Sequence, residues 1–402
     1  MIRLYNIVKD IWDVAALELD RIFHDGGVVL LFCVATLIYP WIFSYAYQNE
    51  CIRNLPMAVV DDSHSVESRR FASKLDATPE VNICYKCNTI EEAHRLMQQR
   101  AINAIVYFPK DYGTRVVTGE TARACLFCDM SSFLYYRSVF TAANAVLVDE
   151  MQFIEADRYS RAGLSGESRA QLVQPIQVDD VKLYLPNGGF TSFLVPALLV
   201  LVLHQTLFLG MCVLYGTTRE KRLIVRSVPA RLRHQGILYR VTVGRALAYL
   251  IIYLPMTAIN LLLLPRIFNL PHIGNPMSIV VFVIPFLLAA IFFSMTICSF
   301  VRNRDAGIVV CIFFSVILLF LSGAIWPQSN MPRFWLYFSY LFPSTFGIQG
   351  FIRINSMAAT LSQVKFEYLM LWLQAVVYFF TASGALHYLL HLRSGRHVSE
   401  RM

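Results

Sequence analysis

The sequence predicts an α-helical integral membrane protein with six transmembrane helices and an extracytoplasmic α/β domain inserted between helices 1 and 2. The first observation is six apolar stretches, each of about 20 residues, which is the length that an α-helix needs to cross a bilayer. The second is composition, because 56% of the residues are hydrophobic and only 15% are charged. The third is a long polar segment between the first and second apolar stretches. The predicted spans are residues 28–47, 190–215, 243–264, 277–300, 307–326 and 366–390.

Residues 1–27 predict a cytoplasmic amphipathic helix that lies in the membrane interface. Apolar residues recur there at spacings of three and four, which places them on one face of a helix. Charged residues such as Asp10 and Glu18 lie largely on the other faces. A helix packed on other protein is the alternative. No small-residue cleavage site follows the first span, which is therefore predicted to be a signal anchor. The apolar face comprises Leu4, Ile7, Ile11, Ala15, Leu19 and Ile22.

The polar segment, residues 48–189, predicts an α/β domain. Short apolar runs alternate with helical patterns, and this alternation favours a small, mostly parallel sheet. A long helix is expected at residues 133–162, which contain no Gly or Pro. The predicted strands are residues 57–60, 81–85, 104–108 and 124–127, and the shorter predicted helices are residues 65–75 and 91–99.

The distribution of basic residues predicts the orientation. Lys and Arg concentrate before the first span, in the loops after the second and fourth spans, and in the tail, residues 391–402. The loop at residues 269–276 has none. Because cytoplasmic loops carry an excess of Lys and Arg, both termini are predicted to be cytoplasmic and residues 48–189 to lie outside. The predicted location is the bacterial cytoplasmic (inner) membrane. Because the basic residues are concentrated in the predicted cytoplasmic segments, the net charge of +8 does not indicate a nucleic-acid partner.

Polar side chains inside the predicted spans have two interpretations. They can line a substrate path through the membrane, or they can form hydrogen bonds between helices. Arg245 and Arg266 lie near span ends, where their charged heads are expected to reach the interface. The polar residues within the spans are His204, Gln205, Asn260 and Gln374.

Four of the nine cysteines form two Cys-x-x-Cys pairs in the polar segment. An oxidising compartment favours at least one disulfide among them, and free buried thiols are the second interpretation. A four-thiol metal site is the weakest interpretation, because residues three apart in a strand point to opposite faces. No metal site and no catalytic residues are therefore predicted. The four residues are Cys84, Cys87, Cys125 and Cys128.

Three stretches resemble a known family. The first is LPMAVVDDSHSVESRRFASKLDATPEV at residues 55–81, and the second is KLYLPNGGFTSFLVPALL at residues 182–199. The third is LSGAIWPQSNMPRFWLYFSYLFPSTFGIQGFIRI at residues 321–354. In this order, and with the six-span layout, they resemble the membrane subunit of a type-2 ABC exporter, in the branch with a large extracytoplasmic domain. The motif residues of the third stretch are Ser322, Gly323, Pro327, Pro332 and Pro343.

The resemblance implies a permease that pairs with itself or with a similar permease, binds cytoplasmic ATPase subunits and exports a substrate. It also implies spans 2–6 within residues 190–390, an external re-entrant segment at residues 327–365 and, as a further partner, a periplasmic adaptor. No GxxxxGK[ST] phosphate-binding loop occurs in the chain. The chain is therefore not expected to be an enzyme or to hold a cofactor, and ATP and Mg²⁺ belong on the partner ATPase.

The resemblance places the ATPase contact in a cytoplasmic coupling loop, residues 216–243. Apolar residues amid arginines suit a protein interface. A basic loop that serves only topology and anionic lipid is the alternative. The predicted coupling residues are Arg219, Glu220, Arg222, Leu223, Ile224, Arg226 and Pro229.

Two functions therefore stand at this point. The first is an export permease, whose aromatic-rich spans, in a chain with 29 Phe and 20 Tyr, suit an amphipathic or lipidic substrate. The second is a non-transporting membrane complex in which the external domain senses a ligand and passes a movement through the spans.

Overall fold

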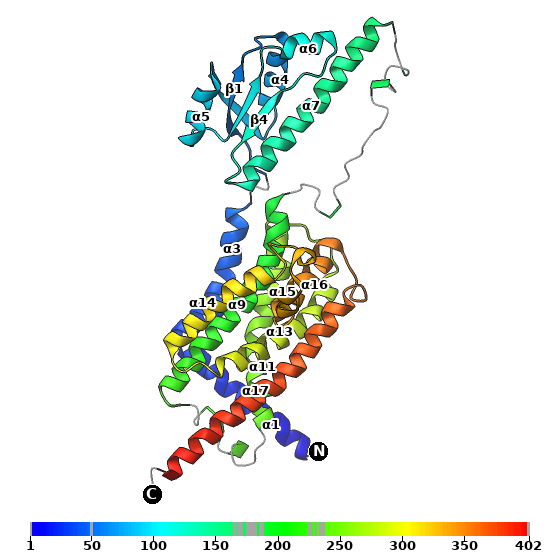
Figure 1. Cartoon of the computed structure of the whole chain (residues 1–402). Helices are drawn as coiled ribbons and strands as arrows, with labels where there is room; N and C mark the ends of the chain where they lie inside the picture. Colours follow the sequence, from blue (N-terminus) through cyan, green and yellow to red (C-terminus); the bar gives the residue numbers. More distant parts are fainter. Residues whose placement is uncertain are drawn as a thin grey trace. The chain divides into compact units, whose positions relative to one another are not determined.

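The computed structural model describes residues 2–48, 51–163, 167, 172–173, 183–184, 189–223, 227–229, 231–232 and 238–399. Side chains are described within these ranges except at residues 2–4 and 391–399. The chain divides into two compact units, Met1–Gln48 with Lys182–Met402, and Asn49–Val181 (Figure 1).

The first unit is helical, and six of its described helical segments are long and apolar enough to cross a membrane. Each coincides with one predicted span, so the prediction of six candidate transmembrane helices is confirmed. Several of these segments are built from more than one element, because π-helical turns interrupt the first and the third. The six segments are Gly26–Ala46, Phe190–Glu220, Leu238–Ile267, Pro276–Cys298, Arg304–Leu321 and Lys365–Leu390.

The helices of the first unit follow the chain in a simple order. A long N-terminal helix precedes the first span, and three short helices lie between the fifth and sixth spans. The elements are α1 (Ile2–His24), α2 (Gly26–Val29), η1 (Leu30–Ala35), α3 (Thr36–Ala46), α9 (Phe190–Glu220), α11 (Leu238–Ala258), η2 (Ile259–Leu263), α12 (Leu264–Ile267), α13 (Pro276–Cys298), α14 (Arg304–Leu321), η3 (Gln328–Asn330), α15 (Arg333–Ser339), α16 (Pro343–Met357) and α17 (Lys365–Ser399).

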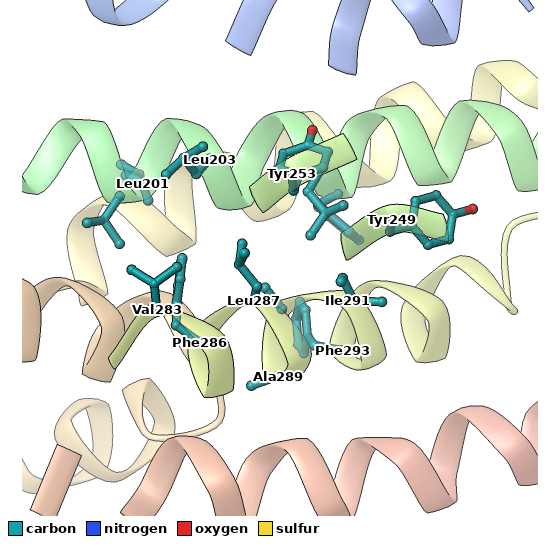
Figure 2. Close-up of a cluster of buried hydrophobic side chains, with 14 of the residues drawn as sticks. Leu201, Leu203, Tyr249, Tyr253, Val283, Phe286, Leu287, Ala289, Ile291 and Phe293 are labelled. Atoms are coloured by element: carbon teal, nitrogen blue, oxygen red, sulfur yellow. The ribbon is translucent and has the colours of Figure 1, made fainter. Parts of the chain in front are cut away.

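The core of the bundle lies around α9, α11 and α13. α9 is apolar on all sides and mostly buried, as expected of a helix enclosed by other helices. Figure 2 shows large side chains from these helices, among them Leu203, Tyr253 and Phe286, meeting in one apolar cluster. α14 is mostly exposed within this single chain. Its outer face is therefore available to lipid or to a second membrane protein.

α16 packs closely on α13 because glycines face aromatic rings. A Cβ at Gly347 would collide with the ring of Phe286, and a Cβ at Gly350 would collide with the ring of Phe282. Small residues let two helices approach closely, which is the usual way of packing in membranes. Residues 343–357 thus belong to the buried bundle. Their re-entry from the outside of the membrane stays a prediction.

The second unit is a four-stranded sheet covered by helices. The strand order is β2-β1-β3-β4, in which β1 pairs in parallel with β2 and β3, and β4 pairs antiparallel with β3. The mostly parallel sheet that the sequence predicts is therefore present. The strands are β1 (Leu55–Asp61), β2 (Val81–Cys87), β3 (Ala104–Phe108) and β4 (Cys125–Cys128).

Helices cover both faces of this sheet. Residues of α4, α6 and α7 share one apolar core with the sheet, and Ala93 of α5 belongs to a separate core. α4 and α5 begin at Ser65 and Thr89, whose side-chain oxygens accept the backbone N–H groups of Ser68 and Glu92. The sequence analysis missed α6, which ends at Gly119 in the left-handed conformation. The helices are α4 (Val66–Asp76), α5 (Ile90–Gln98), α6 (Tyr112–Thr118) and α7 (Phe133–Arg161).

Candidate functional site

A buried carboxylate joins α1 to α11. Glu18 of α1 is 1% exposed, and its Oε1 accepts a hydrogen bond from the Tyr249 hydroxyl at 2.8 Å. Its Oε2 lies 2.7 Å from Arg21 Nη1 and 3.6 Å from Arg245 Nε. Arg245 and Tyr249 are four residues apart, so they share one face of α11. Because a buried charge is costly without partners, this arrangement is what allows a carboxylate at the position.

These neighbours also decide the charge of Glu18. Burial raises the pKa of this carboxyl group, but the charges of Arg21 and Arg245 and the hydrogen bond from Tyr249 lower it by more. The net effect is a pKa below the ordinary value of 4.5. Glu18 is therefore ionised at neutral pH and forms a true ion pair.

Arg245 extends this network to two other segments. Its Nη2 donates to Ser227 Oγ at 2.9 Å, and its Nη1 donates to the Tyr215 hydroxyl of α9 at 3.3 Å. The expectation that the head of Arg245 reaches the interface is wrong, because the residue is 5% exposed and paired with Glu18. A cavity of about 30 Å³ adjoins the network, which is room for little more than one water molecule. We name the set the Glu18 cluster: Glu18, Arg21, Tyr215, Ser227, Arg245 and Tyr249.

A second set of ion pairs joins α1 to α11 and to Arg231. Asp10 Oδ2 lies 2.7 Å from Arg240 Nη1, and Asp10 Oδ1 lies 3.8 Å from Arg231 Nη1. Between the two sets of ion pairs, Gly244 lets the helices touch, since a Cβ there would lie 2.7 Å from the Ile11 carbonyl oxygen. α1 is therefore packed against protein over much of its length. The sequence analysis weighed this packing as the alternative to an interfacial helix; the packing is observed, and the interfacial position of α1 stays a prediction.

Arg219 and Glu220, the first two predicted coupling residues, make contacts within the chain. Arg219 Nη1 donates to the carbonyl oxygens of Ser299 and Val301 at 2.8 and 2.7 Å. Glu220 Oε2 accepts the backbone N–H of Arg304 at 3.4 Å. Both side chains thus tie the end of α9 to the connection between α13 and α14. This role was not anticipated from the sequence.

Three further predicted coupling residues, Arg222, Leu223 and Pro229, lie on the described part of the turn that follows α9. Arg222 is exposed and has a φ of 56°, and Leu223 and Pro229 are half-buried. Ile224 and Arg226 lie outside the described residues. Two residues not singled out from the sequence anchor this turn in a small apolar core: Val228 and Leu232 pack with Val14, Leu238, Val241 and Leu386.

Three of the four polar residues within the spans form hydrogen bonds between helices. Gln205 donates to the Ser315 carbonyl at 3.2 Å, and Gln374 donates to the Tyr340 carbonyl at 2.8 Å. Asn260 in η2 donates to the Thr36 carbonyl at 2.9 Å. Each bond joins a different pair of elements. These three residues therefore join separate pairs of helices, and their hydrogen bonds do not connect them into one substrate path.

His204 differs from these three residues. Its ring is fully buried, and both ring nitrogens lack a hydrogen-bond partner among the described residues. The ring meets Phe293 and Phe286 edge-on, with centroids 5.6 and 6.4 Å away, beside the apolar cluster of Figure 2. A buried polar group without a partner normally lowers stability. His204 is therefore the one predicted path residue whose position packing and hydrogen bonding do not explain.

A polar network that the sequence analysis missed surrounds Asn260. The Thr36 hydroxyl donates to Thr206 Oγ1 at 2.9 Å, and the Tyr253 hydroxyl donates to the same oxygen at 3.2 Å. Thr36 directly follows the π-helical turn η1, and Asn260 lies within η2. Such turns inside helices often occur at functional sites. Threonines inside apolar spans carry only a weak sequence signal, because they also bond to their own helix.

Comparison with known proteins agrees with this architecture of packed membrane helices. The profile of the family described as "ABC-2 family transporter protein" matches residues 27–383. The chain belongs to the ABC-2 family. Among curated proteins, it is similar to the "Probable multidrug ABC transporter permease YbhR" of Escherichia coli strain K12, with 22% identity over 336 residues. The match covers 80% of this chain and 83% of that protein, and the protein of the same name from E. coli O157:H7 gives the same values.

Membership makes the chain an integral membrane protein and an ABC transporter permease, the kind of subunit that is not itself the ATPase. Within this ABC-2 chain, the motif residues lie at turns and helix ends. The Ser322 hydroxyl accepts the Ala324 N–H at 3.2 Å, and Gly323 has a φ of +80°, which favours glycine. Pro343 begins α16, while Pro327 and Pro332 precede η3 and α15.

Cys84, Cys87, Cys125 and Cys128 of this ABC-2 protein, all among the described residues, form no disulfide in the structure. Cys84 and Cys87 lie on β2, whereas Cys125 and Cys128 lie on β4 at the opposite edge of the sheet. Two strands intervene, so the pairs are about 14 Å apart, and residues three apart along one strand are separated by about 10 Å. A disulfide requires Cα atoms within about 7 Å. The four residues are therefore unpaired in the structure, and of the predicted free buried thiols only Cys87 is buried, whereas Cys84 is exposed.

Proposed function

We propose that this chain is the membrane-spanning permease subunit of an ATP-driven exporter, in which a separate cytoplasmic ATPase subunit binds Mg²⁺ and hydrolyses ATP. The observation that best supports it is the Glu18 cluster. It joins α1 and Ser227 to α9 and α11, two helices of the bundle. Nothing in the structure or the comparisons favours the alternative of a non-transporting sensor.

The Glu18 cluster supports this function because a movement of the ATPase must be transmitted to the membrane helices. A partner on the cytoplasmic side can move the spans only through elements that are packed and bonded to them. Buried ion pairs hold their partners in one geometry, because separating the charges leaves one of them unpaired. The Glu18 cluster, the Asp10–Arg240 link and the apolar contacts of Val228 meet this requirement. Exposed Lys221 and Arg222 lie beside them and suit contact with the ATPase.

The proposed topology follows the basic loops. Both termini and the turn after α9 lie in the cytoplasm, and the α/β unit lies outside the inner membrane. The apolar face of α14, exposed in the single chain at Val309, Ile312 and Phe313, suits contact with a second copy or a similar permease. A periplasmic adaptor is a further partner of this arrangement.

The proposed substrate is amphipathic or lipidic, moved out of the cytoplasm or the inner leaflet. The name of the Escherichia coli relative contains the word multidrug. The buried cluster in Figure 2 is aromatic and aliphatic, with His204 as its polar neighbour.

Co-purification tests this proposal. The tagged chain, co-expressed with its ATPase and extracted in mild detergent, should retain an ATP-hydrolysing partner. Lys221→Glu combined with Arg222→Glu should lose that partner while the permease stays folded, because reversing two exposed charges disrupts a charge-complementary contact. Arg266→Glu, an exposed basic residue at α12, is the matched control. Retention of a fully active ATPase by the double variant would place the contact elsewhere, and absence of any ATPase from the wild-type complex would reject the function.

A second variant addresses the predicted apolar anchors. Leu223→Asp combined with Ile224→Asp should likewise release the ATPase, because a charge in an interface core disrupts binding. Correct membrane insertion is checked by unchanged elution in size-exclusion chromatography. Full activity of this variant would remove Leu223 and Ile224 from the coupling residues.

A further inference from the structure

The α/β unit contains a cavity that the proposed function does not use. Its volume is about 340 Å³, which lies within the range of small-molecule sites. It lies between α7 and the connection from α6 to β4, all within the same compact unit. The lining residues on which the inference depends are Phe71, Tyr112, Glu120, Leu147, Met151 and Glu155.

The floor of the cavity is aromatic and includes an unpartnered hydroxyl. Phe71 and Tyr112 are 4% and 8% exposed. The Tyr112 ring is held against Phe108, with ring centroids 5.0 Å apart. No described residue forms a hydrogen bond with the Tyr112 hydroxyl, and its oxygen is not among the fully buried atoms that lack a partner, so it stays accessible. A ligand or water in the cavity can therefore complete the bonding of this hydroxyl.

The rim of the cavity is apolar on the α7 side. Leu147 and Met151, one turn apart, are 44% and 53% exposed. Methionine adapts to irregular apolar surfaces and is frequent at sites that bind varied ligands. The apolar rim therefore extends the aromatic floor towards the opening.

The charged groups of the lining favour a cation. Glu150 is neutralised, because Arg70 Nε donates to both of its carboxylate oxygens and Lys74 Nζ lies 2.8 Å from Oε1. Neither Glu120 nor Glu155 has an ion pair with a described residue. Arg158, the single basic residue of the lining, donates to the Val116 carbonyl oxygen at 2.9 Å. Two carboxylates and the Arg158 guanidinium thus remain, and their net charge of −1 favours a positively charged ligand.

The floor itself stays uncharged. Burial, followed by the nearby Glu150 carboxylate, raises the pKa of Tyr112 to about 12. The phenol is therefore neutral throughout the physiological range and keeps its hydroxyl proton. A neutral aromatic ring attracts organic cations through its negative face, and it also accepts an apolar body.

We propose that this cavity binds an amphipathic organic cation, with its apolar body on Phe71 and Tyr112 and its positive charge near Glu120 and Glu155. Binding here is independent of the direction of transport and of any ATPase. The inference therefore does not rest on the proposed function, and each can fail without the other.

The test uses the full chain in nanodiscs of phosphatidylcholine, with radiolabelled tetraphenylphosphonium as the probe. Tetraphenylborate, an anion of nearly the same shape, separates charge recognition from apolar partition. We expect saturable binding of the cation above that of empty nanodiscs, and little saturable binding of the anion. Equal saturable binding of both ions, or binding no greater than that of empty nanodiscs, would overturn the proposal.

Variants locate the binding. Glu120→Gln combined with Glu155→Gln should raise the Kd for the cation about threefold to tenfold, as expected for the loss of two partly exposed charge contacts. Glu80→Gln combined with Glu91→Gln removes two carboxylates that lie outside the cavity lining and should leave the Kd unchanged. An equal change in both double variants would show a general charge effect and reject the site.

A third variant fills the cavity. Ala122→Trp places a large side chain in the lining and should abolish saturable binding while the thermal transition of the protein is retained. If Ala122→Trp unfolds the α/β unit, the two glutamine pairs still decide the question, because those substitutions are isosteric. Undiminished binding to a folded Ala122→Trp protein would place the ligand elsewhere.

Discussion

Glu18 in the membrane unit and Glu150 in the α/β unit of this ABC-2 permease are both buried, and the two carboxylates are neutralised in different ways. Glu18 in the membrane unit is paired with Arg245, which is itself 5% exposed. Glu150 in the α/β unit is paired with Arg70 and Lys74, whose side chains are 28% and 32% exposed. One ion pair is therefore shielded from solvent at both ends, whereas the other is buried only at its carboxylate.

This difference predicts how each unit responds when its carboxylate is removed. A guanidinium shielded from water cannot be rehydrated without opening the packing between α1 and α11. Arg70 and Lys74 already reach solvent and also lie over the ring of Phe153, at 4.4 and 5.4 Å from its centroid. The Glu18 pair is thus suited to hold a fixed geometry between helices, while the Glu150 pair stabilises a local surface.

The largest expected effect is that of Glu18→Gln. The substitution leaves the buried charge of Arg245 without its partner, which should lower the free energy of unfolding by about 3–5 kcal/mol. Thermal unfolding of the purified protein, followed by tryptophan fluorescence in detergent, measures it. Asp20→Asn is the control, because Asp20 lies on the same helix with a side chain that is 70% exposed. Equal unfolding temperatures for the two variants would contradict the shielding of the Glu18 pair.

Glu150→Gln should have a smaller effect. Hydrogen bonds to charged groups contribute about 1.5–3 kcal/mol each, but Arg70 and Lys74 can recover hydration when the carboxylate is lost. We therefore expect about 1–3 kcal/mol of destabilisation, measured as protease resistance of the α/β unit during heating. Asp149→Asn removes an exposed partner of the same Lys74 and should cost less than about 1 kcal/mol. A larger loss of stability for Glu150→Gln than for Glu18→Gln would contradict the expectation that the more shielded ion pair contributes more.

Protonation of Glu150 at low pH should weaken its ion pair, because it removes the same negative charge as Glu150→Gln. Burial raises the pKa of Glu150, but hydrogen bonds and charges from Arg70 and Lys74 lower it further, so the folded value lies below 4.5. A depressed pKa contributes stability above the unfolded value, and this contribution is lost as the pH falls from about 4.5 through the lower folded value. The difference in unfolding temperature between wild type and Glu150→Gln should therefore shrink below about pH 4.5. A constant difference across this range would contradict the ion pair.

The smallest expected effects concern neutral polar groups in the bundle. Gln205→Leu removes one interhelical hydrogen bond and should cost about 0.6 kcal/mol, the typical value inside membrane proteins. His204→Leu should leave stability unchanged or raise it, because no described residue pairs with its ring nitrogens. Both are measured by thermal unfolding in the same detergent. If His204→Leu destabilises the protein more than Gln205→Leu, the ring has a partner that the described residues do not include.

The helices and the sheet could be predicted because their signals are local. Long apolar runs marked all six spans, and alternating strand and helix patterns marked the α/β unit. α6 escaped because its seven residues carry little periodicity, and its clearest signal is the terminal Gly119. The two Cys-x-x-Cys pairs of the α/β unit were expected to contain a disulfide, but the strand order places the pairs on opposite edges of the sheet.

The sequence by itself determined the six candidate membrane-spanning helices, because the length and hydrophobicity of each depend only on adjacent residues. It also excluded an ATP site of the phosphate-loop type on this chain, because that motif is contiguous. Only the tertiary structure decided which polar residues meet. The buried face of α1 includes Asp10, Val14 and Glu18 in addition to the predicted Ala15 and Ile22. A carboxylate can be buried only where another helix supplies its countercharge, and Arg245 is more than 200 residues away along the chain.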